Sequence, residues 1–198
     1  LPADLIHALP ASVRLICEAG TGYNNVDLGA CRERGISVSN VPTYATEAMA
    51  HMAITSLMAC SCSLWQQAAA FGCGDFQYLE QCHPGSLTHV ELHGKTLGLV
   101  GGLGTIGKRV AAIASALGMK VVASSSRMAA IGQQNGMEVV SLDELRETSD
   151  LVSIHCPLNA NTKGLIGRVE LAKMKPTALL INTARGRSID EEAMVKAL

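Results

Sequence analysis

The chain contains a strand, a glycine-rich turn and a helix in immediate succession, and this segment constrains the fold more than any other. Residues 97–100 form a short apolar run. Gly102, Gly104 and Gly107 follow with the spacing G-x-G-x-x-G, and a helical pattern covers 105–117. The first glycine permits a tight turn, the second lets the backbone approach a pyrophosphate, and the third lets helix and strand pack closely. The segment therefore predicts a dinucleotide-binding unit; a βα turn with glycine for packing alone is the alternative.

The start of this helix is expected to hold the phosphates. Its first N–H groups have no partner within the helix, and they lie at the positive end of the helix dipole. Gly101 precedes the motif, so the strand end can shift by a residue and Gly101 can share the role of the first glycine. The predicted cofactor contacts in this turn are Gly102, Gly104, Thr105, Ile106 and Gly107.

The end of the second strand distinguishes the two nicotinamide cofactors. An Asp or Glu there would accept hydrogen bonds from the adenine ribose, but this chain has Ser124, Ser125, Ser126 and Arg127. Hydroxyls can donate to a 2′-phosphate, and an arginine can pair with it bidentately. We therefore predict NAD(P) as the cofactor, leaning to NADP, with Ser125, Ser126 and Arg127 as contacts. An ordinary polar strand end with a solvated Arg127 is the alternative.

Strands alternate with helices along the chain, which indicates an α/β fold with a parallel sheet. The predicted strands are 13–17, 36–39, 97–100, 120–123, 151–154 and 178–181, and the predicted helices are 26–34, 46–70, 105–117, 142–147, 169–174 and 190–198. The expected caps are Asn25 or Asp27 with Gly35 for 26–34, Thr43 or Thr46 for 46–70, and Ser141 for 142–147. Residues 71–92 read as a connecting loop.

Composition gives no support for a nucleic-acid or membrane partner. The chain has 16 Lys and Arg against 17 Asp and Glu, a formal charge of -1, and its basic residues are scattered, so no nucleic-acid or membrane partner is predicted. No apolar run reaches transmembrane length. Seven cysteines, an odd count, indicate free thiols in a reducing compartment and hence a cytoplasmic protein. Cys60, Cys62, Cys73, Cys82, His83 and His89 make zinc conceivable, but Cys60 and Cys62 would face different sides of a helix, and no metal is predicted.

Four blocks carry a resemblance to a known family. They are "EAGTGYNNVDLGACRERGISVSNVPTYATEAMA", "LHGKTLGLVGGLGTIGKRVAAIASALGMKV", "SDLVSIHCPLNANTKGLIG" and "LAKMKPTALLINTARGRSIDEEAMVKAL". In these the chain resembles the D-isomer-specific 2-hydroxyacid dehydrogenases of the glycerate dehydrogenase/hydroxypyruvate reductase type. The resemblance implies a Rossmann-type doubly wound parallel sheet plus part of a flavodoxin-like substrate domain. The implied units are a partial substrate domain at 1–45, a linker or dimerisation helix and loop at 46–92, and an NAD(P)-binding domain, incomplete at its C-terminus, at 93–198.

The resemblance also implies the site and the reaction, which is hydride transfer between the cofactor and a small 2-oxo or 2-hydroxy acid in a homodimer. Arg185 matches the family's catalytic arginine, whose fork would hold the substrate carboxylate and carbonyl oxygen. The implied substrate-binding residues are Ala19, Gly20, Thr21, Gly22 and Arg185, because the loop would offer backbone N–H groups to an anion. The implied cofactor contacts beyond the glycine turn are Thr46, His155, Cys156, Pro157, Thr162, Thr183, Ala184 and Arg185.

Several features depart from the family pattern. The Glu and His of the family's acid pair are expected beyond Leu198, and no initiator Met is present, so the chain is expected to be a piece of a longer enzyme without appreciable turnover alone. Asn24 stands where many relatives have Asp, and His51 where many have an acidic residue. A non-catalytic, corepressor-like NAD(P) binder, a truncated inactive relative and a structural dimerisation fragment remain alternatives. Hydroxypyruvate/glycerate and glyoxylate/glycolate are the favoured substrates, and phosphoglycerate and lactate stay open.

Overall fold

The larger part of the protein is a six-stranded sheet between layers of helices. The computed structural model describes residues 1–74, 89–125, 132–134 and 137–197. The strand order is β5-β6-β4-β3-β7-β8, and every neighbouring pair is parallel except β5 and β6. The strands are β3 Thr96–Val100, β4 Lys120–Ser124, β5 Gly132–Gln134, β6 Met137–Val139, β7 Leu151–Ile154 and β8 Leu179–Asn182.

The register brings the carboxyl ends of the central strands to one edge of the sheet. Val100, the last residue of β3, pairs with Ser124 of β4 on one side and Ile154 of β7 on the other. Ile154 in turn pairs with Asn182, the last residue of β8. Ligands bind at this edge in open parallel sheets, so whatever follows Val100, Ser124, Ile154 and Asn182 converges on a common site.

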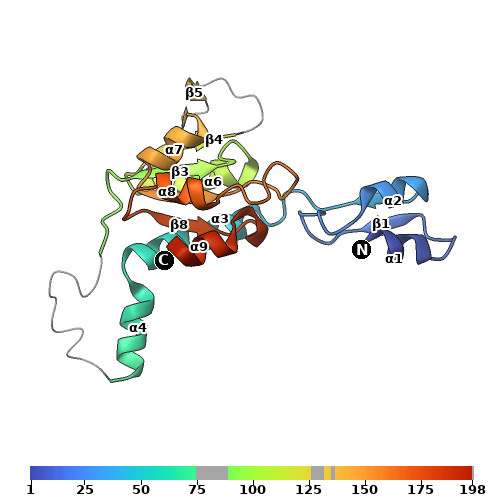
Figure 1. The fold of residues 1–198 in the computed structure, drawn as a ribbon, viewed down its shortest axis with the longest axis horizontal. Helices are drawn as coiled ribbons and strands as arrows, with labels where there is room; N and C mark the ends of the chain where they lie inside the picture. The colour runs from blue at the N-terminus through green and yellow to red at the C-terminus, as the bar shows by residue number, and fades with distance from the viewer. Residues whose placement is uncertain (75–88, 126–131, 135–136, 198) are drawn as a thin grey trace.

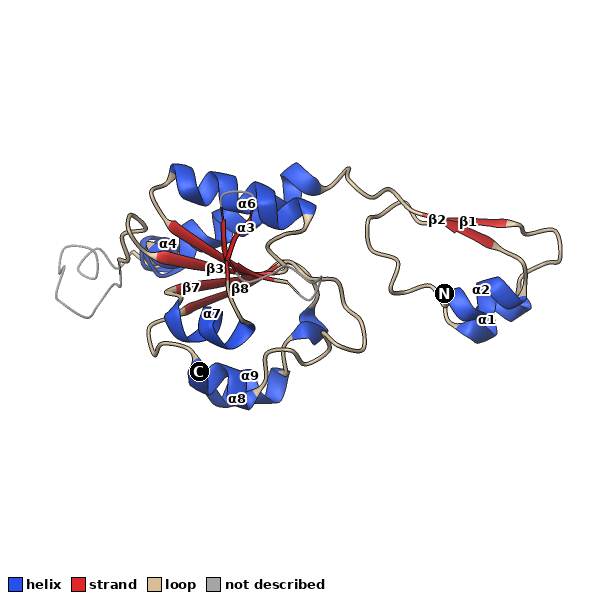
Figure 2. Ribbon diagram, turned by 90° about the horizontal axis from the view of Figure 1, so that it is seen from above, coloured by secondary structure: helices blue, strands red, loops and turns tan. Residues whose placement is uncertain are grey.

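Helices cover both faces of this sheet, as Figure 2 shows. On one face, Ala53 and Leu57 of α3 and Ala114 of α6 pack with the buried strand residues Leu97 and Leu99. On the other face, the segment around α7 and α8 packs against the opposite side of the same strands. The helices of this body are α3 Thr46–Ser61, α6 Thr105–Ala116, α7 Leu142–Thr148, α8 Arg168–Lys173 and α9 Glu191–Ala197. Because apolar side chains leave both faces of the strands, the sheet is doubly wound, as predicted.

The N-terminal residues form a smaller lobe beside this body (Figure 1). Its strands β1 Leu15–Cys17 and β2 Ser37–Ser39 are parallel, and α1 Ala3–Ala8 and α2 Leu28–Glu33 pack together beside them. The core of the lobe consists of Ile6, Val26, Ala30, Cys31 and Ile36. Asp27 caps α2, accepting a hydrogen bond from the Ala30 N–H at 3.0 Å, and Gly35 follows with φ +64. Both features agree with the prediction; α1 was not predicted.

The single helix predicted over 46–70 is wrong. It is two helices, α3 and α4 Leu64–Gly72, bent by 68° where Ser63 takes a left-handed conformation with φ 50. Local polar groups compete for the helix carbonyls here: Ser61 Oγ donates to the Met58 carbonyl at 3.0 Å and Gln67 Nε2 to that of Cys62 at 2.7 Å. The predicted cap was also wrong, because Ala45 occupies the N-cap and Thr46 Oγ1 donates instead to the Thr43 carbonyl at 2.9 Å.

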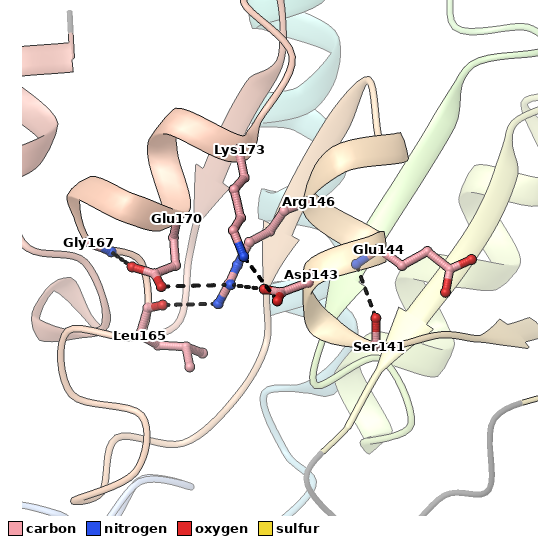
Figure 3. A network of polar contacts seen from close by, with 8 residues as sticks. All are labelled: Ser141, Asp143, Glu144, Arg146, Leu165, Gly167, Glu170 and Lys173. Carbon is pink, nitrogen blue, oxygen red and sulfur yellow. Dashed lines mark hydrogen bonds and ion pairs between the residues drawn. The ribbon is translucent and has the colours of Figure 1, made fainter.

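A polar cluster fastens α7 to α8 (Figure 3). The buried Arg146 side chain pairs with Asp143 at 2.9 Å, lies 3.8 Å from Glu170, and donates to the Leu165 carbonyl at 3.3 Å. Lys173 reaches Asp143 at 3.0 Å, and its hydrogen bond holds the pKa of that carboxyl below its usual range. The cluster fixes the segment that leads into α8. In this segment Ile166 forms a parallel β-bridge with Ile189, which follows β8 in the sequence.

The remaining predicted elements are present with small shifts in their bounds. Strand 151–154 has the predicted limits, and Ser141 caps α7 through a hydrogen bond from the Glu144 N–H at 3.1 Å. Residues 71 and 72 belong to the end of α4 rather than opening a loop. Strands β5 and β6 and the 3-10 turn η1 Gly186–Ser188 were not predicted.

Candidate active site

The glycine turn joins β3 to α6 with each glycine in a different role. Gly101 carries the left-handed backbone, with φ +81, in line with the expectation that it can share the role of the first glycine. Gly102 is needed for packing, since a Cβ there would lie 2.8 Å from the Cβ atoms of Ala123 and Leu99. A Cβ at Gly107 would lie 2.6 Å from the Gly102 backbone, so the two glycines let α6 sit directly on the strand end.

The N-terminus of α6 is open toward the sheet edge. Gly104 is the exposed N-cap residue, and the Lys108 N–H donates to its carbonyl at 2.9 Å. Within the described chain, the N–H groups of Thr105, Ile106 and Gly107 have no acceptor. Three free donors at the positive end of a helix fit a pyrophosphate, and the absence of a side chain at Gly104 leaves the approach clear.

The end of β4 lies next to this turn. The Gly101 N–H donates to the Ser124 carbonyl at 2.7 Å, and Ser125 follows directly. The predicted contacts Ser126 and Arg127 lie outside the described residues.

The loop after β7 packs against the glycine turn. A Cβ at Gly101 would lie 3.0 Å from the carbonyl group of His155 and the N of Cys156. His155 Nε2 forms a hydrogen bond with Ser153 Oγ at 2.9 Å, and burial lowers the pKa of this histidine to about 4. His155 is therefore neutral at pH 7 and a poor proton donor to a substrate. Burial likewise raises the pKa of Cys156, so its thiol stays protonated.

Thr162 holds the same loop in shape. Its side chain is buried, donates to the Pro157 carbonyl at 2.6 Å and accepts from the Asn159 N–H at 2.8 Å. Pro157 itself is exposed at the sheet edge. The hydroxyl of Thr162 is thus occupied within the protein, and the geometry gives this residue the task of ordering the loop.

The segment after β8 presents Arg185 to the N-terminal lobe. Asn182 closes the turn, accepting from the Ala184 N–H at 3.0 Å and donating to the Arg185 carbonyl at 2.8 Å. The guanidinium of Arg185 donates through Nε to Asn24 Oδ1 at 3.0 Å and through Nη1 to the Ala184 carbonyl at 2.9 Å. Thr183 Oγ1 is buried and has no partner among the described residues, which leaves it able to bond a ligand.

The loop of residues 19–22 approaches this arginine most closely at Gly22, where a Cβ would overlap Nη2 of Arg185. The loop is held from behind: Asn40 Nδ2 donates to the Thr21 carbonyl at 2.9 Å, and Thr21 Oγ1 to the Val41 carbonyl at 3.0 Å. Within the described chain, no N–H of residues 19–22 finds an acceptor. The loop therefore offers free N–H donors at residues 19–22, and Arg185 lies against the loop at Gly22.

Local sequence reasoning missed two residues of this arrangement as contributors, Asn24 and Asn182. Asn182 could have been recognised, because an Asn at a strand end often bonds the backbone of its own turn. Asn24 could not, since it meets Arg185 across 161 residues of sequence. Thr46 is the first residue of α3, and its hydroxyl donates to the Thr43 carbonyl in the preceding turn.

Two further findings concern metal ions and membrane-spanning helices. Among the described residues, no three His, Cys, Asp or Glu side chains are grouped to hold a metal ion; Cys82 and His83 lie outside these residues. In the same part of the chain, no single helix is long and apolar enough to cross a membrane. The bent pair α3 and α4 passes that test together, by length and composition only.

Comparison with known proteins decides the family. Residues 58–198 match the model of the D-isomer specific 2-hydroxyacid dehydrogenase NAD binding domain. The chain belongs to this family. Its relatives include the glyoxylate reductase of Aeropyrum pernix, 38% identical over 100% of this chain and 59% of the relative. Another is the hydroxypyruvate reductase of Thermotoga maritima, 37% identical over 97% of this chain and 60% of the relative.

Solved structures of the family agree. A glyoxylate reductase from Paecilomyes thermophila superposes with a TM-score of 0.87 at 38% identity, over 99% of this chain and 58% of that one. A D-lactate dehydrogenase from Aquifex aeolicus, complexed with NAD and lactic acid, gives a TM-score of 0.88 at 30% identity, over 100% and 57%. The chain thus spans less than two thirds of the relatives it matches, and its Rossmann-type fold is theirs.

Proposed function

We propose that the protein is an oxidoreductase that transfers a hydride between a nicotinamide cofactor and C2 of a small 2-oxo or 2-hydroxy acid. The observation that carries the proposal is the placement of Arg185. Arg185 follows β8 at the carboxyl edge of the sheet, two strands away from the strand that precedes the glycine turn. Its guanidinium contacts the loop of residues 19–22 at Gly22. A cation between a dinucleotide-type turn and a loop of free N–H groups suits a short carboxylic acid.

The protein groups would divide the work of binding and charge stabilisation. The N–H groups of residues 20–22 and the fork of Arg185 would bind the substrate carboxylate, and Arg185 would also donate to the carbonyl oxygen at C2. Negative charge grows on that oxygen during reduction, so a fixed donor there stabilises the transition state more than the ground state. When bound, the cofactor supplies or accepts the hydride. Asn24 and the Ala184 carbonyl keep the guanidinium in place without neutralising it.

The cofactor would be held by the glycine turn and the loop after β7. The free N–H groups of Thr105, Ile106 and Gly107 fit its pyrophosphate, and the unpartnered Thr183 hydroxyl fits the ribose beside the nicotinamide. We favour NADP over NAD because no carboxylate occupies residues 124–127. Relatives with each cofactor exist: an imino acid reductase complexed with NADPH and D-Arg superposes with a TM-score of 0.88 at 31% identity.

Glyoxylate and hydroxypyruvate are the substrates we favour, because relatives above 35% identity are named as their reductases. We also propose a homodimer. The exposed large hydrophobic residues on α3 and α4 are Met52, Met58, Leu64, Trp65 and Phe71. Figure 1 shows α4 extending away from the sheet, and an exposed apolar strip of this kind is typical of a subunit interface.

Substituting Arg185 tests the proposal directly. In Arg185→Gln the paired donors and the charge are lost, so glyoxylate binding to the complex with oxidised cofactor should weaken by about 100-fold, from two charge-assisted bonds of about 1.5 kcal/mol each. Cofactor affinity, followed by fluorescence titration, should fall much less, because the glycine turn is intact and Arg185 is only one of the implied cofactor contacts. The matched control is Arg187→Gln, an exposed arginine two residues along. Glyoxylate binding that is absent in the wild type, or equal in Arg185→Gln, refutes the proposal.

A further inference from the structure

The loop of residues 19–22 lies between two opposite charges, each held by one of two consecutive asparagines. Asn24 Oδ1 accepts from Arg185 Nε at 3.0 Å, while Asn25 Nδ2 donates to Glu18 Oε2 at 3.3 Å. Glu18 as a residue is partly buried, and Asn25 holds its carboxylate at one end of the loop, as Asn24 holds the guanidinium at the other.

The glycines of the loop show where each charge lies. A Cβ on Gly20 would be 3.1 Å from Oε1 of Glu18, and a Cβ on Gly22 would overlap the guanidinium of Arg185. Two residues of chain span about 7 Å at most. A three-carbon acid with its carboxylate at Arg185, lying along the loop, would extend toward the Glu18 carboxylate.

We propose that Glu18 is a specificity-determining residue that favours 2-oxo acids with a hydrogen-bond donor on C3 and discriminates against those with an anionic group there. The proposal rests on the function proposed above. A hydroxyl at C3 can donate a charge-assisted bond to the carboxylate. A phosphate or second carboxylate at C3 would face a like charge in a partly desolvated loop, which disfavours binding.

Glu18→Gln separates this role from a purely structural one. Glutamine keeps an oxygen that can accept from Asn25 Nδ2, so the loop stays ordered while the charge is removed. Binding to the complex with oxidised NADP, which cannot reduce the acid, is measured by isothermal titration calorimetry with glyoxylate, hydroxypyruvate and 3-phosphohydroxypyruvate. The matched control is Glu33→Gln. The exposed Glu33 side chain lies on α2, with Oε2 3.5 Å from His7 Nε2.

In Glu18→Gln we expect the phosphorylated acid to bind about tenfold tighter and hydroxypyruvate several-fold weaker, with glyoxylate changed less than about twofold because it has no C3 group. Glu33→Gln should match the wild type with all three acids. If glyoxylate binds but the two other acids keep their wild-type ratio, the role of Glu18 is refuted and the proposed function stands. An equal loss for all three acids also refutes it, since Glu18 would then only order the loop. If glyoxylate fails to bind the wild type, the proposed function fails, and this inference with it.

Discussion

Alanine at Gly22 should damage substrate binding and leave the fold intact. Gly22 is not among the glycines with positive φ, so alanine fits the backbone. The new Cβ would overlap Nη2 of Arg185 and lie 2.9 Å from its Cζ. These atoms are the far end of a flexible side chain, so the guanidinium can turn away from the new methyl group at little cost. We expect the free energy of unfolding to change by less than about 1 kcal/mol.

The cost falls on the ligand instead. Turning the guanidinium breaks its bond to Asn24 and removes the donors that we propose bind the oxo acid. One charge-assisted bond contributes about 1.5–3 kcal/mol. The dissociation constant of glyoxylate should therefore rise between about tenfold and 150-fold. Calorimetric titration of the complex with oxidised cofactor measures this, and thermal unfolding checks stability. Gly186→Ala is the matched control, because nothing lies within 4 Å of its Cβ position. Wild-type glyoxylate affinity in Gly22→Ala would show that the guanidinium does not bind the substrate where we place it.

Two further predictions concern the cofactor side. Gly107→Ala would place a Cβ 2.6 Å from the Gly102 backbone, which cannot move aside. We expect the variant to lose about 1–3 kcal/mol of stability in thermal unfolding and to lose cofactor binding in fluorescence titration. The control, Ser115→Ala at an exposed position of the same helix, should lose neither. Burial lowers the pKa of His155 to about 4, below its unfolded value near 6.5, so the unfolded chain binds the extra proton first as pH falls. The free energy of unfolding, measured with denaturant, should be at its full value above about pH 6.5 and fall by at most about 3 kcal/mol by pH 4. His155→Asn should flatten this pH dependence. An equal slope in the wild type and the variant would contradict the prediction.

The nucleotide-binding half of the fold could be predicted because its signals are local. Strand 151–154 is an apolar run bounded by Asp150 and His155, and Ser141 caps its helix through a residue three positions away. The motif also located the glycine turn, and Gly101, which the sequence allowed to share the role of the first glycine, takes the positive φ.

The failures came from competition that a hydrophobic pattern does not record. The largely apolar composition continues through residues 46–70, yet the serine and glutamine side chains near Ser63 bond helix carbonyls and the chain bends. The short strand β6 has little pattern of its own and exists because β4 supplies a parallel edge at Val122 and Ala123. Elements that depend on their neighbours more than on their own residues are the ones that reading along the chain cannot find.

The position of Arg185 depends both on local contacts within its own turn and on contacts with residues distant in the sequence. Its own turn is set locally, since the Asn182 side chain bonds the backbone of the two residues that follow Thr183, accepting from the Ala184 N–H and donating to the Arg185 carbonyl. Its guanidinium, however, is placed by Asn24 and Gly22 in the other lobe. A change in the relative position of the lobes must therefore alter the direction of this side chain, while the glycine turn, which is built within one sheet, is unaffected. Cofactor binding and substrate binding should accordingly respond separately to substitutions in the N-terminal lobe, with only the substrate site depending on contacts that cross between the lobes.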